Sequence, residues 1–145
     1  MPTKNLILGY KNFLHDFNQE KQFYIDLAKK GQHPKVCWIG CSDSRVVPEI
    51  IMGALPGDMF VIRNIANIVP PQNAKEHCIG SVLEYAVFEL KVSHIIICGH
   101  TGCGGIKALL EETQSIKNSP ISQWLKHAYL AKERILASRV ASERL

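Results

Sequence analysis

The sequence has 145 residues, of which 46% are hydrophobic and 21% are charged, so it is long enough and apolar enough to form one globular core. Its net charge of +4 is spread along the chain, which argues against a nucleic-acid-binding surface. No apolar stretch approaches the ~20 residues of a membrane span, and no signal-peptide pattern opens the chain. We therefore expect a single domain, cytoplasmic, that binds neither nucleic acid nor a membrane.

The predicted elements begin with an amphipathic helical arm over residues 1–30, where apolar side chains recur at three- and four-residue spacings until Gly31. Three short apolar runs bounded by turn residues then predict buried parallel strands. These runs are residues 36–39, 59–62 and 94–98. Strand and helix therefore alternate after the arm.

Further helices are predicted at residues 79–90 and 105–112, and Ser119 followed by Pro120 opens a last helix. The alternation predicts an α/β fold with an open, mainly parallel β-sheet flanked by α-helices. In such a sheet, functional residues gather beyond the carboxyl ends of the strands. We divide the single domain into the arm at 1–30, a core at 31–112 and a C-terminal helical part at 119–145.

Five cysteines are present, an odd number in a chain of ordinary composition. This is not the dense, even set of a small secreted disulfide scaffold. We therefore expect reduced thiols. In a reducing compartment, a cysteine beside polar residues and histidine is more often a metal ligand or a nucleophile than half of a crosslink.

Metal-ligand side chains directly follow two of the predicted strands. Cys41 comes after the first strand, and His100 and Cys103 come after the third. If these strands are neighbours, two thiolates and one imidazole meet at one rim of the sheet, and this is a standard zinc-binding set. Each motif alone could be a buried cysteine or a loop histidine; together they favour a metal. The fourth position is either open to water or closed by Asp43, the only carboxylate close in sequence.

Three motifs in order resemble the signature of the β-class carbonic anhydrases. They are Cys-x-Asp-x-Arg at 41–45, Gly-Asp-Met-Phe-Val-Ile-Arg-Asn-Ile-Ala-Asn at 57–67 and His-x-x-Cys-Gly-Gly at 100–105. The similarity runs from about Gly31 to about Leu110. It implies a β-carbonic anhydrase-like fold that hydrates carbon dioxide reversibly to bicarbonate and a proton, by attack of a zinc-bound hydroxide. It also implies one Zn²⁺ per chain and a homodimer or a dimer-based tetramer.

The same resemblance implies roles for particular residues. Cys41, His100 and Cys103 would bind the zinc, and Asp43 with Arg45 would form the catalytic pair beside it. In a closed state of the family, Asp43 becomes the fourth ligand. The plain alternative for Asp43 and Arg45 is an exposed ion pair, worth ~0–1 kcal/mol.

Two further groups of residues are implied by position. Gln32, Phe60 and Tyr85 match residues that line the carbon dioxide pocket, partly from a neighbouring subunit. Trp38 and Arg63 match two parts of a bicarbonate-binding regulatory pocket. Each has an ordinary alternative, because the aromatic residues would suit a core or an interface and Gln32 a turn. Arg63 could equally join loops by hydrogen bonds.

Members of the family usually continue several tens of residues further, with another strand at the sheet edge and a closing helix, which we expect this chain to lack. A catalytically silent zinc protein of the same fold is therefore the main alternative function. A nucleotide-binding loop fits less well, because the glycines at 99, 102 and 104 do not follow the dinucleotide-binding pattern. A thiol phosphatase would need a longer anion loop than this chain allows, because Cys41 and Arg45 are only four positions apart.

Overall fold

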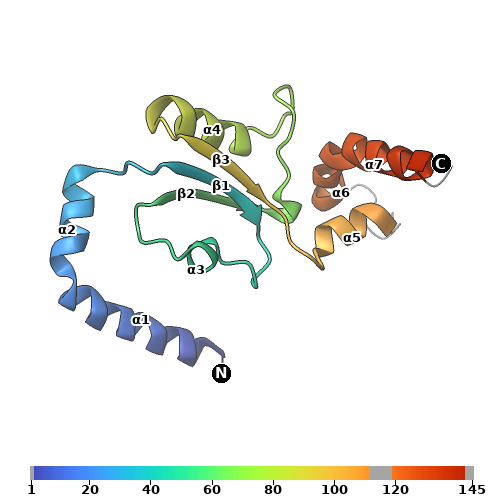
Figure 1. The fold of residues 1–145 in the computed structure, drawn as a ribbon. Helices are drawn as coiled ribbons and strands as arrows, with labels where there is room; N and C mark the ends of the chain where they lie inside the picture. Colours follow the sequence, from blue (N-terminus) through green and yellow to red (C-terminus); the bar gives the residue numbers. More distant parts are fainter. Residues whose placement is uncertain (1, 112–118, 143–145) are drawn as a thin grey trace. The chain divides into compact units, whose positions relative to one another are not determined.

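The computed structural model describes residues 2–111 and 119–142, with side chains for 3–111 and 119–138. Two compact units are present. The described part of Met1–His33 holds α-helices and no strand, whereas Pro34–Leu145 holds the sheet and the helices around it (Figure 1).

The first unit consists of α1 (Pro2–Gln19) and α2 (Lys21–Lys30). The predicted arm is thus helical but divided at Glu20, whose backbone (φ −102°, ψ 21°) leaves the helical region. Aromatic rings hold the two helices together across this break. The Tyr24 ring centroid lies 6.1 Å from that of Phe13 and 4.7 Å from that of Phe17, within the usual range for aromatic pairs.

The second unit is built on a three-stranded parallel sheet in the order β2-β1-β3. The central strand is β1 (Val36–Cys41), flanked by β2 (Met59–Asn64) and β3 (His94–Cys98). Val36 pairs with Met59 on one side and with His94 on the other. All three predicted strands are confirmed, β1 and β2 each extending further toward the rim than predicted.

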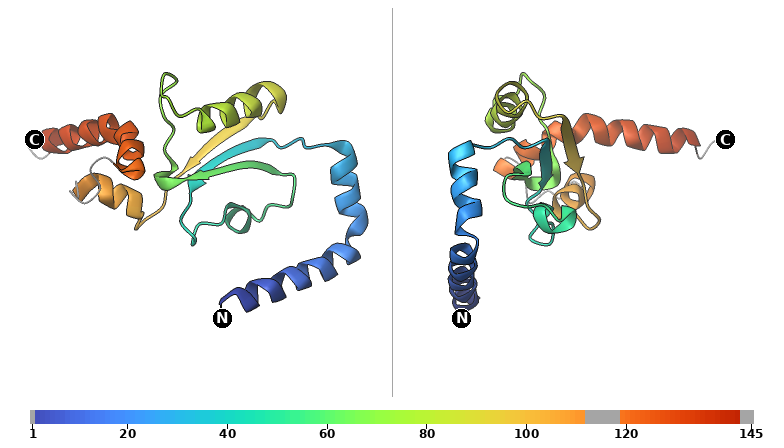
Figure 2. Two further views of the ribbon diagram at one scale, coloured as in Figure 1. Left: turned by 180° about the vertical axis from the view of Figure 1, so that it is seen from behind. Right: turned by 60° about the vertical axis from the view of Figure 1, so that its left-hand side comes forward.

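Helices cover both faces of this sheet. The short α3 (Pro48–Met52) lies on one face and α4 (Cys78–Glu84) on the other, as the views in Figures 1 and 2 agree. The predicted helix at 79–90 exists, but its second half widens into the π-helical turn η2 (Tyr85–Glu89). The sequence analysis did not predict α3, which is only five residues long and therefore too short to show a helical period.

The remaining elements lie beyond the carboxyl ends of the strands (Figure 2). They are η1 (Ile65–Asn67), α5 (Gly104–Glu111), α6 (Pro120–Leu125), η4 (Lys126–Ala128) and α7 (Tyr129–Ser142). The predicted last helix opens at α6 as expected, because the side chain of Ser119 accepts a hydrogen bond from the backbone N–H of Ser122, but η4 divides it from α7. Glu112 and residues 143–145, which belong to two predicted helices, lie outside the described residues.

Two buried clusters hold the second unit together. One joins Cys37 and Ile39 of β1 to Ala86 of η2. The other lies at the carboxyl ends of the strands and joins β1 to the C-terminal helices. Its buried members are Cys41, Ala66, Ile68, Cys103, Leu109 and Leu125.

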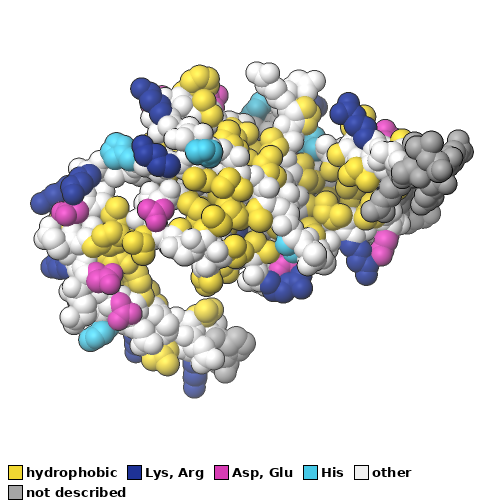
Figure 3. All heavy atoms as spheres, viewed as in Figure 1, with side chains coloured by type: hydrophobic (Ala, Val, Ile, Leu, Met, Phe, Trp, Pro, Cys, Tyr) yellow, Lys and Arg dark blue, Asp and Glu magenta, His cyan; other side chains and the backbone are white. Residues whose placement is uncertain are grey.

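Large apolar side chains also remain exposed on both units (Figure 3). They include Ile95 and Ile97 of the outer strand β3. Within the described ranges, no helix combines the length and the apolar character needed to cross a membrane.

We expect Ile39→Ala to lower the free energy of unfolding by about 2–5 kcal/mol, because it leaves a cavity in the middle of the central strand. Ile39 is 0% exposed. Ile50→Ala on α3 is the matched control, since Ile50 is 78% exposed and surface changes usually stay within about 0.5 kcal/mol. Urea unfolding of both variants checks the prediction, and equal effects would contradict it.

Candidate metal centre

Three potential metal ligands meet at the carboxyl ends of β1 and β3. Cys41 is the last residue of β1, and His100 and Cys103 lie in the turn that leads from β3 into α5. Their ligand atoms all lie within 4.8 Å of one another, and the Cys41 and Cys103 sulfurs are 3.8 Å apart. The parallel pairing of β1 with β3 therefore brings together residues that are far apart in sequence.

The turn after β3 presents its two ligands from one tight bend. Gly102 has φ +66°, a left-handed conformation that glycine adopts without strain. The carbonyl of Cys103 then accepts a hydrogen bond from the Lys107 N–H and begins α5. His100 Nδ1 lies 2.9 Å from the Thr101 carbonyl oxygen, which fixes the ring so that Nε2 faces the sulfurs.

The loop after β1 is held by the neighbouring strand β2. The Ser42 N–H donates to the Asn64 carbonyl at 2.9 Å. Arg63 donates from Nε to the Cys41 carbonyl at 2.9 Å and from Nη2 to the Asp43 carbonyl at 2.6 Å. This matches the alternative in which Arg63 joins loops by hydrogen bonds.

The surroundings of Cys41 favour its thiolate form. Burial acts to raise the pKa of the Cys41 thiol, but polar groups close to the sulfur outweigh it and lower that pKa to about 7. The contributing groups are the Asp43 N–H, the His100 ring, the Ala66 N–H and the Cys103 thiol. A thiolate is the form of cysteine that binds metals.

Asp43 is held beside the three ligands by Arg45. The guanidinium donates from Nε to Oδ1 at 2.9 Å and from Nη2 to Oδ2 at 2.8 Å, and the Arg45 backbone N–H adds a bond to Oδ1 at 3.0 Å. These bonds hold the pKa of the Asp43 carboxyl well below its usual range. Asp43 Oδ2 lies 3.9 Å from His100 Nε2, so an ionised carboxylate faces the cluster.

The donor set fits a divalent cation of borderline softness such as Zn²⁺. His100 Nε2 is buried without a hydrogen-bond partner, which is costly unless another ligand uses the nitrogen. Its neighbour Cys41 also raises the pKa of His100, so this position favours positive charge. A bound cation would give Nε2 a partner and would also supply the positive charge that this position favours.

The predicted pocket residues lie in two separate places. Phe60 of β2 and Tyr85 of η2 pack together, with ring centroids 5.8 Å apart, but neither lines the hollow of about 290 Å³ beside His100 and Cys103. Its apolar walls come from Ile106 and Leu110 of α5. Gln32 is exposed in the first unit, after the end of α2.

Trp38, the partner of Arg63 in the predicted regulatory pocket, is buried in the middle of β1. It is 3% exposed, and its indole Nε1 has no hydrogen-bond partner. A Cβ atom at Gly40 would lie 2.7 Å from that nitrogen, so the glycine makes room for the indole. In the strand register Gly40 is opposite Arg63.

The sequence analysis did not predict the left-handed bend in the segment after β2. Ala66 and Asn67 both have positive φ values, 63° and 46°, which are uncommon for residues other than glycine. Asn64 stabilises this bend, because its side chain accepts from the Ile68 N–H at 2.8 Å and donates to the Ile68 carbonyl at 3.0 Å. The only signal in the sequence is the pair of asparagines around Ile65 and Ala66, a residue type that tolerates such turns.

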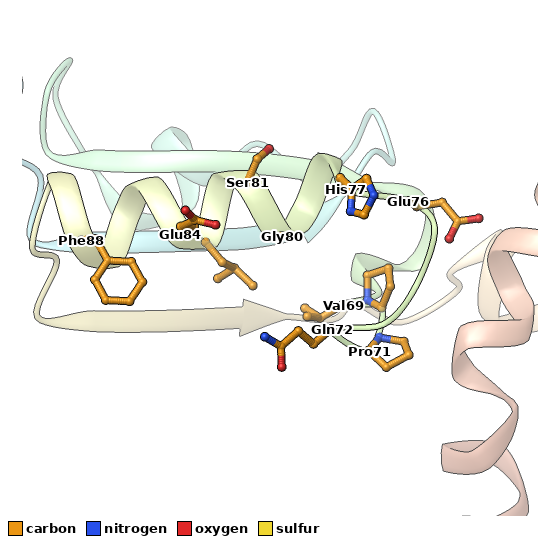
Figure 4. Close-up of a pocket in the computed structure, with 11 residues that line it drawn as sticks. Val69, Pro71, Gln72, Glu76, His77, Gly80, Ser81, Glu84 and Phe88 are labelled. Carbon is orange, nitrogen blue, oxygen red and sulfur yellow. The ribbon is translucent and has the colours of Figure 1, made fainter.

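A larger hollow, of about 560 Å³, lies along α4 and the loop before it. Figure 4 shows Glu76 and His77 at one end and Phe88 at the other. The Glu76 carboxylate accepts a hydrogen bond from His127 Nε2 at 3.1 Å. None of the predicted site residues lines this hollow.

We expect Gly105→Ala to destabilise the fold by about 1–3 kcal/mol, as overpacking of a close contact does. The added Cβ would lie 2.8 Å from Ile65 Cγ2 and 3.0 Å from Ala66 Cβ. Gly104→Ala is the control, because nothing lies within 4 Å of a Cβ there. Thermal and urea unfolding compare the two variants; a Gly104 variant as unstable as the Gly105 variant would refute the contact as the cause.

Comparisons with known proteins agree with this arrangement. Residues 36–144 match the family model described as carbonic anhydrase. A carbonic anhydrase of Synechococcus elongatus is 37% identical over 134 residues, which are 92% of this chain and 49% of that protein. The chain therefore spans about half the length of the curated relatives it matches.

Solved structures show the same fold. The β-carbonic anhydrase CcaA superposes with a TM-score of 0.88 at 37% identity, covering 96% of this chain and 63% of that one. A structure from a study of two tetrameric β-carbonic anhydrases of Sordaria macrospora superposes with a TM-score of 0.76 at 38% identity, covering 94% of this chain and 70% of that one.

Proposed function

The chain belongs to the carbonic anhydrase family, with the fold of the β class, and we propose that it catalyses the reversible hydration of carbon dioxide to bicarbonate and a proton. The observation that carries this proposal is the convergence of two sulfurs and one imidazole nitrogen within 4.8 Å, beside an ionised carboxylate. These are the parts that metal-assisted hydration needs.

Cys41, His100 and Cys103 would hold one Zn²⁺ per chain. When bound, the metal would acidify a water molecule enough to make it a nucleophile toward carbon dioxide near neutral pH. The protein's own contribution is to favour the deprotonated Cys41 sulfur and to keep the imidazole correctly turned. The low pKa of Cys41 and the contact between His100 Nδ1 and the Thr101 carbonyl support both functions.

Asp43 would act as a hydrogen-bond acceptor that orients the attacking water. An ionised carboxylate can only accept, and Arg45 engages both of its oxygens, so its direction is set before substrate arrives. Arg45 also donates to the Gly102 carbonyl at 3.3 Å, which ties the carboxylate to the turn that carries His100 and Cys103.

The hydrogen bonds between Arg45 and Asp43 favour an open fourth position at the metal. In the silent alternative, Asp43 would itself complete the ligand set. It would first have to leave a two-point contact with Arg45, and such bidentate, charge-assisted pairs are among the stronger hydrogen bonds. The geometry therefore supports the active enzyme over the closed, silent one.

The roles of the outer residues stay proposals. Phe60, Tyr85 and Gln32 would line the path of carbon dioxide, and Trp38 with Arg63 would bind a regulatory bicarbonate. The Trp38 N–H, which has no hydrogen-bond partner among the described residues, supports the role of Trp38 in binding bicarbonate. Assembly into a homodimer or a dimer-based tetramer is proposed by analogy with the tetrameric relatives.

We expect about one zinc per wild-type chain and none in Cys41→Ser, because a serine hydroxyl is a poor ligand in place of a thiolate. Cys78→Ser is the matched control, since Cys78 is exposed and outside the ligand group. Elemental analysis of purified protein and stopped-flow hydration of carbon dioxide measure both properties. Full activity in metal-free protein would refute the zinc mechanism, whereas zinc without activity would support the silent alternative.

We expect Arg45→Gln to retain zinc but to lower kcat/KM for hydration by about 10²-fold, because small errors in positioning cost this much. Arg134→Gln on α7 is the control, since Arg134 is exposed and outside the site. Zinc content and stopped-flow rates are measured on the same preparations. Unchanged rates in the Arg45 variant would show that the orientation of Asp43 by Arg45 does not contribute to catalysis.

A further inference from the structure

We propose that Trp124 is a positioning residue for the metal ligand Cys41, acting through the peptide group between Ile65 and Ala66. The inference rests on the proposed function in one respect, that Cys41 binds the metal. It assigns a role in the metal site to a residue of the C-terminal helices, which no motif of the sequence connects with that site.

The first contact is a hydrogen bond from the indole to the carbonyl side of this peptide. Trp124 Nε1 donates to the Ile65 oxygen at 2.8 Å. The indole is held in place by its neighbours, since it packs against the buried cluster that contains Cys41 and Ala66 and meets the His127 ring edge-to-face at 5.7 Å. Its N–H is therefore directed by packing on several sides.

The second contact is made by the amide side of the same peptide. Ala66 shares a buried cluster with Cys41, and its N–H, directed toward the Cys41 sulfur, helps to lower the pKa of that thiol. This direction depends on the left-handed backbone of Ala66 (φ 63°, ψ 23°), which is unfavourable for a residue with a Cβ atom. Strained backbone of this kind persists only where the surroundings impose it, and it gathers at functional sites.

Three contacts impose the left-handed backbone conformation of Ala66. The Asn64 side chain closes the bend onto Ile68, and the absence of a side chain at Gly105 leaves the room that Ala66 fills. Trp124 supplies the third restraint at the Ile65 carbonyl. Without it, the peptide could turn its N–H away from the sulfur and relax.

A peptide group also transmits the effect of one hydrogen bond to the next. It is planar and delocalised, so a donor at its oxygen polarises the N–H and strengthens the bond that this N–H makes. The receiving atom is a metal-ligand sulfur, and bonds to such atoms set ligand orientation and metal affinity. Trp124 would thus tune Cys41 without touching it.

The chain offers a matched control for this effect. Lys132 of α7 also donates to a backbone carbonyl of the core, that of Leu109 at 3.0 Å. The amide of that peptide belongs to Leu110 inside α5 and does not face a ligand sulfur. Lys132→Met therefore removes a comparable bond between the C-terminal helices and the core, and the Leu109 peptide that accepts it does not lead to Cys41.

The test replaces the metal with cadmium-113 and measures scalar coupling between the metal and amide protons, which passes through a hydrogen bond to a ligand sulfur. We expect coupling to the Ala66 amide proton in the wild type, reduced coupling in Trp124→Phe, and wild-type coupling in Lys132→Met. Zinc affinity, measured by competition with a chromogenic chelator, should fall roughly tenfold in Trp124→Phe and stay within twofold in Lys132→Met.

Cadmium bound without coupling to Ala66, or equal coupling and affinity in Trp124→Phe and the wild type, overturns the inference. Failure of the wild type to bind any metal instead overturns the proposed function. If Trp124→Phe does not fold, benzothienylalanine incorporated at position 124 keeps the ring shape and removes only the N–H. The same loss of coupling is then expected, and its retention counts against the role of Trp124.

Discussion

The parallel pairing of β1 with β3 is the constraint on which the site depends. It places Cys41 and the turn containing His100 and Cys103 at one rim, and the backbone hydrogen bonds of the ladder keep them there. Two sulfurs 3.8 Å apart and a buried, unpartnered nitrogen would be an unfavourable arrangement without a cation. The buried central strand holds this arrangement in place, because Cys37 and Ile39 pack into a cluster that excludes water from the sheet behind the site.

Hydrogen bonds around the ligands do the remaining positioning. Arg45 orients Asp43, and Arg63 of the neighbouring strand holds the carbonyls of Cys41 and Asp43. The two Arg63 bonds go to backbone carbonyls and so set where the loop runs, whereas the two Arg45 bonds set where the Asp43 side chain points. Such outer contacts determine how strongly a metal is bound and how its ligands are oriented.

The C-terminal helices contribute to the site as well as to the core. Leu125 belongs to the buried cluster that includes Cys41 and Cys103, and Trp124 packs against it. The hydrogen bond from Trp124 to Ile65 extends this packing to the strained bend at Ala66. Stability and metal binding are therefore connected here, because the residues that close the core also restrain the peptide facing a ligand sulfur.

The sequence by itself determined the three strands, the alternation with helices and the ligand types, because apolar runs, caps and ligand spacing are local properties. The division of the arm at Glu20, the short α3, the π turn at Tyr85 and the left-handed bend at Ala66 were decided only by tertiary structure. The bend at Ala66 depends on distant residues, since it packs against Gly105 and shares a buried cluster with Cys41. Local propensity would not favour such a bend, whereas packing and long-range hydrogen bonds impose it.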